Sequence, residues 1–227
     1  MAIEAASDEG AIFIEPRWPI ALAILVFMAI SIALRIAEPH HEALGPVWLV
    51  PGLEIGMLLA LLAADPGHIG TRARWLRRVA IALILALAAL TLLYTGTLIV
   101  DLIRGGKVTN SAGPLLASGA VAWLGNCLIF SLLYWELDSG GPLARYRRER
   151  AFPDFAFTQH QNPELAPPGW RPRYVDYLVL GLTTNTAFSP TDVLPLSAWA
   201  KLTMALQSLI SLALVGLVIA RAVNVFT

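Results

Sequence analysis

Long apolar runs alternate with short polar connections along this chain from residue 18 onward. An apolar run of about 20 residues is the length that a helix needs to cross a bilayer. The pattern predicts five full membrane-spanning helices: Trp18–Ala37, Trp48–Ala64, Val79–Val100, Ala112–Tyr134 and Trp199–Val223. Residues 1–17 are short and acidic, and we expect them to form a tail at the membrane surface.

Composition supports a membrane protein. Hydrophobic residues make up 57% of the chain, charged residues only 14%, and the mean hydropathy is +0.66. Soluble domains carry about a quarter charged residues. The formal net charge is zero and no large basic face is visible, so a nucleic-acid partner is not expected. The single cysteine, Cys127, excludes an intramolecular disulfide. The sequence therefore predicts an all-α polytopic protein of the plasma membrane, typical of a bacterial inner membrane.

No catalytic or cofactor motif accompanies these helices. A Ser/His/Asp set, a glycine-rich phosphate loop and the usual metal-ligand spacings are all missing from the sequence. His40 and His41 are adjacent, so they cannot both point at one ion from a helix. We therefore expect neither an enzyme nor a metal or other cofactor.

Residues 138–173 form the one substantial hydrophilic segment, after the four-helix region 18–137. The basic run Arg145–Arg150 in the first part of this segment indicates a short amphipathic helix at the membrane surface. The rest of the segment is expected to be at most an ordered loop. Four arginines there are candidates to contact the lipid headgroups of the bilayer: Arg145, Arg147, Arg148 and Arg150.

The remaining segment, residues 174–227, predicts a hairpin. Asp176–Ala187 is apolar but too short to cross a bilayer comfortably, and Phe188–Pro195 carries two helix-breaking prolines. Leu202–Ala220 contains no charge and is long enough for a full span. A short helix, a polar kink and a full helix are typical of a re-entrant pore hairpin, although a short spanning helix remains an alternative.

The residues from Asp176 to Asn224 resemble the pore region of potassium-channel-type cation channels. That family reads roughly D-A-L-Y-F-S-x-x-T-x-T-T-V-G-Y-G-D-x-x-P-x-T-x-x-G-R/K. Asp176 and Asp192 are sixteen residues apart, as the two aspartates of the pattern are, and Leu178, Thr184 and Thr186 coincide with its leucine and two of its threonines. The tail of the pattern is matched by Asp192, Pro195, Ser197, Ala200 and Lys201, two of them as conservative replacements.

The resemblance implies a pore that several copies of the chain close together, hence a homo-oligomer and specifically a tetramer. Its filter-like residues would be Thr184, Asn185, Thr186, Ala187, Phe188, Ser189, Pro190, Thr191 and Asp192. The family's filter glycines are missing here, and Pro190 fixes its φ and removes an N–H donor. We therefore expect passage of a small cation without potassium selectivity.

Three further polar residues lie within the apolar helices. Gln207 and Ser211 lie at helical spacing on the last span, where they favour an interhelical hydrogen-bonded seam over the alternative of a pore lining. Glu54 lies in the middle of the second span, where a charge costs about 2.5–3.5 kcal/mol. Glu54 is either a proton or cation site or a residue with a polar helix neighbour.

Three functions follow, with the channel as the first hypothesis. The alternatives are a non-conducting membrane scaffold or partner subunit, and a proton-coupled transporter that uses Glu54. Charge asymmetry adds an orientation: with the N-terminus in the cytoplasm, twelve basic residues share its side and four do not. This bias places the filter-like kink on the cytoplasmic side, as in an inverted pore, unless residues 174–189 make a sixth crossing.

Overall fold

The structure, a computed structural model, describes residues 18–37, 52–56, 59, 71–104, 112–187 and 192–226. These ranges are mostly helical. Within these ranges, three helices are long and apolar enough to cross a membrane, namely Arg77–Arg104, Gly113–Gly140 and Ala198–Asn224, and Trp18–Ala33 is a shorter apolar helix. Most of the predicted second span, Trp48–Ala64, lies outside the described residues, although residues 52–56 and 59 are helical.

In the described part of the chain, five longer helices and several short elements form the fold. The longer helices are α1 (Trp18–Ala37), α3 (Thr71–Arg104), α4 (Ala112–Leu137), α7 (Tyr174–Ala187) and α8 (Ala198–Phe226). Between α4 and α7 the chain forms a 3₁₀ turn (Asp138–Gly140), α5 (Pro142–Arg147), β1 (Phe155–Phe157), α6 (Thr158–Gln161) and a second 3₁₀ turn (Pro163–Leu165), and β2 (Val193–Pro195) precedes α8.

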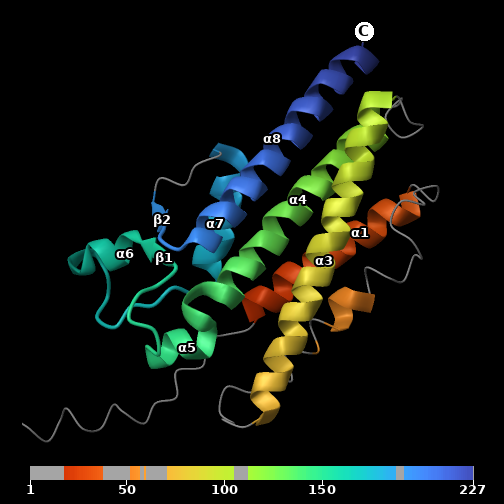
Figure 1. Ribbon diagram of the computed structural model, residues 1–227. Helices are drawn as coiled ribbons and strands as arrows, with labels where there is room; N and C mark the ends of the chain where they lie inside the picture. The colour runs from red at the N-terminus through yellow and green to blue at the C-terminus, as the bar shows by residue number, and fades with distance from the viewer. Residues whose placement is uncertain are drawn as a thin grey trace, which may run out of the picture.

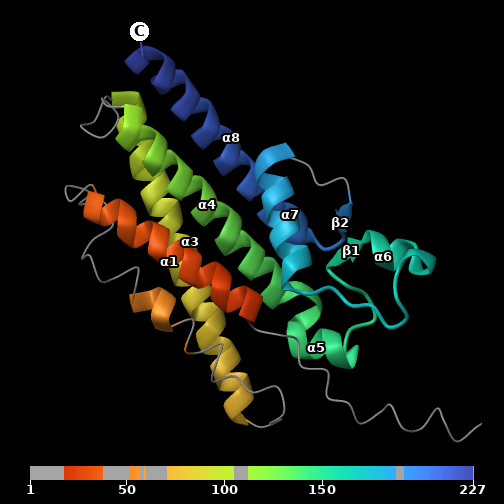
Figure 2. The same ribbon diagram turned by 180° about the vertical axis from the view of Figure 1, so that it is seen from behind.

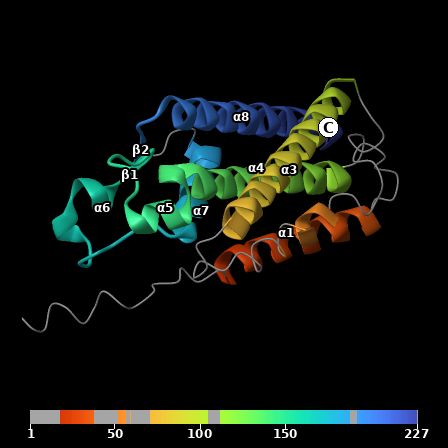
Figure 3. The ribbon, with the colours of Figure 1, turned by 60° about the horizontal axis from the view of Figure 1, so that its bottom comes forward.

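Helix α4 is the centre of the molecule. Figure 1 shows it between α1 and α3 on one side and α7 and α8 on the other, and in Figure 3 α1 and α8 lie on opposite sides of it. Its span is 61% buried, against 28% for the spans of α3 and α8. Glycines permit this close packing, because a Cβ on Gly125 would lie 3.0 Å from Phe27 and one on Gly181 would lie 2.9 Å from the Cys127 carbonyl oxygen.

The end of the bundle at which α4 ends is here called the polar end, and the opposite end the far end. At the polar end, Arg77 near the start of α3 donates from Nε to Glu136 Oε1 at 3.0 Å. Tyr177 of α7 and Trp199 of α8 are bonded to Asp138 and Asp154 there. Helices α3, α7 and α8 therefore all begin at the polar end, where α5, α6 and the strands also gather (Figure 2).

Helices α7 and α8 run side by side in the same direction. Gln207 Nε2 donates to the Gly181 carbonyl oxygen at 2.8 Å, and Ser211 Oγ donates to the Asn185 carbonyl oxygen at 2.7 Å. Both pairs are 26 residues apart, so the register is constant along a full turn of both helices. The chain must therefore return the whole length of α7 before α8 begins.

A small antiparallel sheet closes the polar end. Strands β1 and β2 pair Phe155 with Pro195 and Phe157 with Val193. Phe155 is fully buried, with its ring 5.1 Å from that of Tyr134 and 5.6 Å from that of Trp199. Strand β1, α6 and the second 3₁₀ turn thus interrupt the loop that the sequence predicted after the first helix of the hydrophilic segment. The two strands are also the one departure from an all-α fold among the described residues.

Candidate functional site

Local sequence signals mark the starts of the hairpin's two helices, α7 and α8. Asp176 Oδ2 accepts the backbone N–H of Arg173 at 2.7 Å, and its carboxylate lies in the first turn of α7, where a negative charge favours the helix dipole. Ser197 Oγ accepts the N–H of Ala200 at 3.4 Å at the start of α8. Asp176 and Ser197 therefore mark the positions at which α7 and α8 begin.

A buried polar network joins α4, α7 and α8, and we call it the amide network. Its centre is Gln207, whose Nε2 donates to Asn185 Oδ1 at 2.8 Å and whose Oε1 accepts the Tyr134 hydroxyl at 2.6 Å. Asn126 Nδ2 also donates to Asn185 Oδ1, at 3.0 Å, and Asn185 Nδ2 donates to the Trp123 carbonyl oxygen at 3.0 Å. Every amide of this network is therefore hydrogen-bonded within one copy of the chain.

Several predicted pore residues are members or neighbours of this network. Gln207, Ser211 and Thr184 are 0% exposed, and Asn185 is 1% exposed. Ser211 Oγ accepts the Trp123 indole N–H at 3.0 Å, and Thr184 Oγ1 donates to the Leu180 carbonyl oxygen at 2.7 Å. The pore-lining interpretation of Gln207 and Ser211 is corrected, because their side chains face α4 and α7. The side chains of Thr184 and Asn185 are likewise buried within one copy of the chain.

Two of the predicted filter-like residues remain accessible. Thr186 is exposed near the end of α7, and Asp192 is exposed next to β2. Thr158 Oγ1 donates to the Asp192 carbonyl oxygen at 2.9 Å, which ties this backbone to α6 at the polar end. Ala187 ends α7, and Phe188, Ser189, Pro190 and Thr191 lie outside the described residues.

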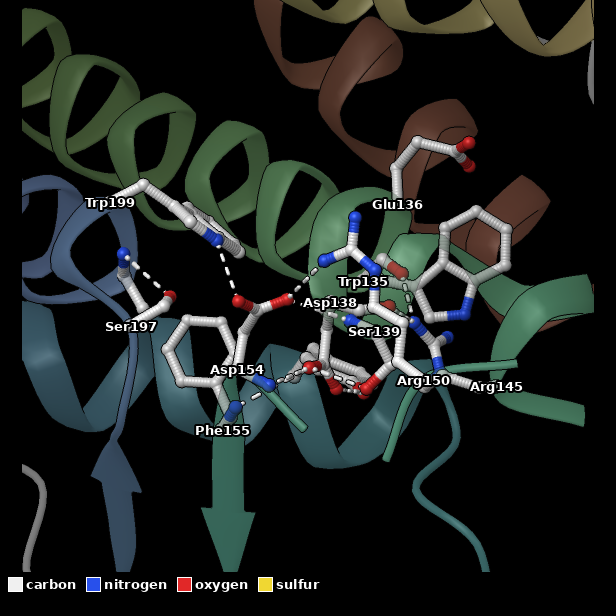
Figure 4. Close-up of polar contacts among 12 residues, drawn as sticks. Trp135, Glu136, Asp138, Ser139, Arg145, Arg150, Asp154, Phe155, Ser197 and Trp199 are labelled. Carbon is white, nitrogen blue, oxygen red and sulfur yellow. Dashed lines mark hydrogen bonds and ion pairs between the residues drawn. The ribbon is translucent and has the colours of Figure 1, made fainter. Parts of the chain in front are cut away.

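Two buried aspartates at the polar end hold the hairpin in place, and we call them the aspartate anchor. Asp138 accepts the backbone N–H groups of Asp154 and Phe155, at 2.9 and 3.3 Å, and the hydroxyl of Tyr177. Asp154 accepts the Trp199 indole N–H at 2.8 Å (Figure 4). The anchor thus connects the end of α4, strand β1 and the first turns of α7 and α8.

Ser139, between α4 and α5, completes the anchor. It has a left-handed backbone, with φ of 55°, and its N–H donates to Asp154 Oδ2 at 2.9 Å while its hydroxyl donates to Asp138 Oδ1 at 3.0 Å. A left-handed serine costs free energy that these two bonds offset. The anchor was not predicted from the sequence. A signal was available, since D-S-G-G directly follows an apolar helix and glycines permit the left-handed turn.

One of the four predicted headgroup arginines has a different role. Arg145 Nη1 donates to the carbonyl oxygens of Trp135 and Asp138 at 2.6 and 3.0 Å, and its guanidinium lies 4.9 Å from the centre of the Tyr177 ring. Arg145 therefore bonds the Trp135 carbonyl oxygen in the last turn of α4 and the Asp138 carbonyl oxygen just beyond it, which also accepts the Gly141 N–H. Arg147, Arg148 and Arg150 are exposed.

Glu54 lies away from the hairpin's exposed residues. It is 1% exposed and borders a small cavity between α1, α3 and α4, lined by apolar side chains and by Tyr174, the first residue of α7. A Cβ on Gly56 would lie 3.7 Å from Leu83, so this segment packs against α3. The intramembrane acid predicted from the sequence is thus buried next to the start of the hairpin helix.

His160, at the polar end, has a pKa that is shifted by its surroundings. Burial lowers the pKa of His160, and the charge of Asp138 acts in the opposite direction. The imidazole lies between Phe157 and Trp170, with ring centres 6.0 and 5.3 Å away. Its Nδ1 accepts the Phe157 N–H at 3.3 Å, which requires the neutral form of that nitrogen.

Comparison with known proteins adds no relative to this picture. Neither a family model, nor a curated protein, nor a solved structure matches the chain.

Proposed function

We propose that this chain is a multi-pass protein of the plasma membrane whose hairpin, residues 174–226, forms part of an oligomeric path for small cations. The observation that carries the proposal is the shared starting level and parallel register of α7 and α8. Helix α7 has 14 residues and is about 21 Å long, whereas the hydrocarbon core is about 30 Å thick. A helix that enters from the polar end and stops at this depth is a re-entrant helix.

The direction of the other helices supports five full crossings around this re-entrant helix. Ile20 and Ile24, early in α1, pack in one cluster with Tyr134 near the end of α4, so α1 begins at the polar end as α3 does. The chain between α1 and α3 must then cross back. The helical residues 52–56, with Glu54 buried among α1, α3 and α4, support this second span.

The arginine bias gives the hairpin an orientation. The polar end of the bundle carries the basic residues of α5 and those near the starts of α3, α7 and α8. Basic residues next to membrane spans favour the cytoplasmic side. We infer that the kink opens to the cytoplasm, which is inverted relative to potassium channels. Asp192 would then lie at a cytoplasmic mouth, where its carboxylate attracts cations.

We assign the ion path to the accessible residues at the end of α7 and next to β2, Thr186 and Asp192. The kink that the sequence predicts between them would need water or protein to satisfy its polar groups at membrane depth, and an aqueous path supplies water. Because the amide network occupies the inner side of α7, the path would lie on its outer side. Several copies would be needed to enclose it, and the resemblance to tetrameric channels makes a tetramer our hypothesis.

Cation flux into liposomes tests this assignment. We compare wild type with Asp192→Asn and Thr186→Val, and Thr184→Val serves as the matched control because it makes the same change on the buried side of α7. We expect wild-type flux, and a severalfold decrease or a changed ion preference in the first two variants. Equal flux in all four proteins would place the path elsewhere, and the pore assignment would be wrong.

The same measurement separates the two alternatives. Absence of flux from any folded, inserted sample would support a non-conducting scaffold or partner subunit. Glu54, buried beside Tyr174, favours a proton-coupled transporter as the second candidate. That function predicts pH-dependent flux that Glu54→Gln abolishes and Asp192→Asn preserves.

A further inference from the structure

Two arginines from distant parts of the chain lie against the same glycine turn at the polar end. Gly140 and Gly141 follow α4 with φ values of +84° and +99°. A Cβ on Gly141 would lie 2.8 Å from Arg77 Nη2, and one on Gly140 would lie 3.4 Å from Arg150 Nε. The positive φ values favour glycine at both positions, and at Gly141 a Cβ would also displace the Arg77 guanidinium. We call these four residues the arginine turn.

Both guanidinium groups keep donors available at the surface. Arg77 bonds Glu136 through Nε and Nη2, and its side chain is 42% exposed. Arg150 is 57% exposed, and its Nη1 is 3.5 Å from Asp154 Oδ2. An arginine has five N–H donors, so these acids engage only part of each group. The turn therefore offers two positive, partly bonded side chains to a further anion.

The arginine turn lies at the expected level of the lipid headgroups. The candidate span of α3 begins at Arg77 and that of α4 ends at Gly140. Phe152, two residues beyond Arg150, is 81% exposed. An exposed aromatic ring beside arginines is typical of a segment whose ring enters the interface while its charges meet phosphate groups.

We propose that the arginine turn binds the phosphate of an anionic phospholipid, with Phe152 inserted beside the acyl chains. Guanidinium groups bind phosphate through paired N–H donors, and Arg77 and Arg150 both lie against the same two-glycine turn, so a headgroup at this turn would meet two of them. Anionic lipids are enriched in the leaflet that faces the cytoplasm, which is where the arginine bias locates the polar end. The proposal is independent of whether the hairpin conducts ions.

Native mass spectrometry of the purified full chain tests the lipid site. Wild type, Arg150→Gln and Arg104→Gln are titrated with phosphatidylglycerol or with phosphatidylcholine, and Arg104 is the matched control because it is an exposed arginine at the far end of α3. We expect wild type to retain phosphatidylglycerol preferentially. Arg150→Gln should weaken that lipid about fivefold, as expected for one arginine near a surface, and Arg104→Gln should not.

Competition with inorganic phosphate and a second variant distinguish a lipid site from a site for the free anion. Phe152→Ser replaces an exposed ring that the fold does not need, and we expect this variant to bind phosphatidylglycerol more weakly than wild type. This second variant decides the test if Arg150→Gln does not fold. Equal retention of the two lipids by wild type would overturn the proposal, as would equal losses in Arg150→Gln and Arg104→Gln. Displacement of the lipid by millimolar inorganic phosphate, with no effect of Phe152→Ser, would identify free phosphate as the ligand and reject the lipid.

Discussion

At the scale of single residues, Asp138 explains how a buried acid is accommodated at the membrane boundary. Burying a carboxylate is costly unless hydrogen bonds replace its hydration. Asp138 is 0% exposed and accepts donors from Ser139, Asp154, Phe155 and Tyr177. Its neighbours therefore offset the cost, and in return the carboxylate fixes the turn that brings β1 and α7 together.

His160 gives this region a pH dependence. Its pKa is lowered in the folded protein by burial, so the unfolded chain binds a proton more readily as the pH falls. Stability is retained above the ordinary histidine pKa of about 6.5 and decreases below it. Because the side chain is partly solvated, we expect the melting midpoint to fall by at most about 3 °C between pH 7.5 and pH 5.5.

Thermal unfolding of wild type and His160→Asn in detergent measures this effect. The asparagine oxygen can still accept the Phe157 N–H but does not titrate. The difference between the two melting midpoints should therefore change with pH. The other titratable groups contribute equally to both proteins, so their effects cancel in this difference. A difference that stays constant from pH 7.5 to pH 5.5 would show that His160 does not contribute.

At the scale of elements, the amide network sets how α7 packs. The sequence of α7 alone is that of a short apolar helix with a polar end, and it does not indicate which neighbour its Asn185 meets. Register comes from Gln207, which bonds the Gly181 carbonyl oxygen and Asn185 Oδ1 on one side and Tyr134 on the other. A polar residue within apolar helices thereby specifies one arrangement among several of similar apolar packing.

Removing the Gln207 amide should loosen this arrangement. Gln207→Leu deletes three side-chain hydrogen bonds, and at about 0.6 kcal/mol for each bond in a membrane protein we expect a loss of about 2 kcal/mol. Denaturation in mixed micelles measures the free energy of unfolding. Ser208→Ala is the control, since it removes a single long bond of 3.4 Å to the Thr184 carbonyl oxygen. Equal stability of both variants would contradict a structural role for the network.

At the scale of the whole molecule, the polar end and the far end are expected on opposite sides of the membrane. Leu165 is 72% exposed in the segment between β1 and α7 at the polar end, and Asn224 is exposed near the end of α8. Single cysteines at these positions, in a Cys127→Ser background, report the orientation. An impermeant maleimide should label Asn224→Cys on intact cells and Leu165→Cys only after lysis.

The opposite labelling pattern would reverse the orientation and place the kink outside. In the proposed topology α7 is re-entrant and α8 crosses the membrane once, so positions 165 and 224 lie on opposite sides. Labelling of both cysteines on intact cells would contradict this crossing by α8. Cys127 is buried within α4, so its replacement by the similarly small serine should leave both reporters comparable.

Much of the helical framework was determined by the sequence itself. Apolar runs long enough to cross a bilayer predicted the three candidate spans α3, α4 and α8, and the prolines after Ala187 predicted that α7 is short. These features are local: the length of an apolar run and the position of a proline each determine a helix from residues that are neighbours in the sequence. The same reasoning favoured a seam for Gln207 and Ser211, the packing seen in the structure.

Only the tertiary structure decided how these elements combine. Asp138 and Asp154 are sixteen residues apart and look like ordinary loop acids, yet they join four elements through hydrogen bonds. The common starting level of α7 and α8 also depends on pairs far apart in the chain, as does the inward position of Arg145. Sequence periodicity records which residues are apolar, whereas the partner of a buried polar group is chosen by the packing of distant segments.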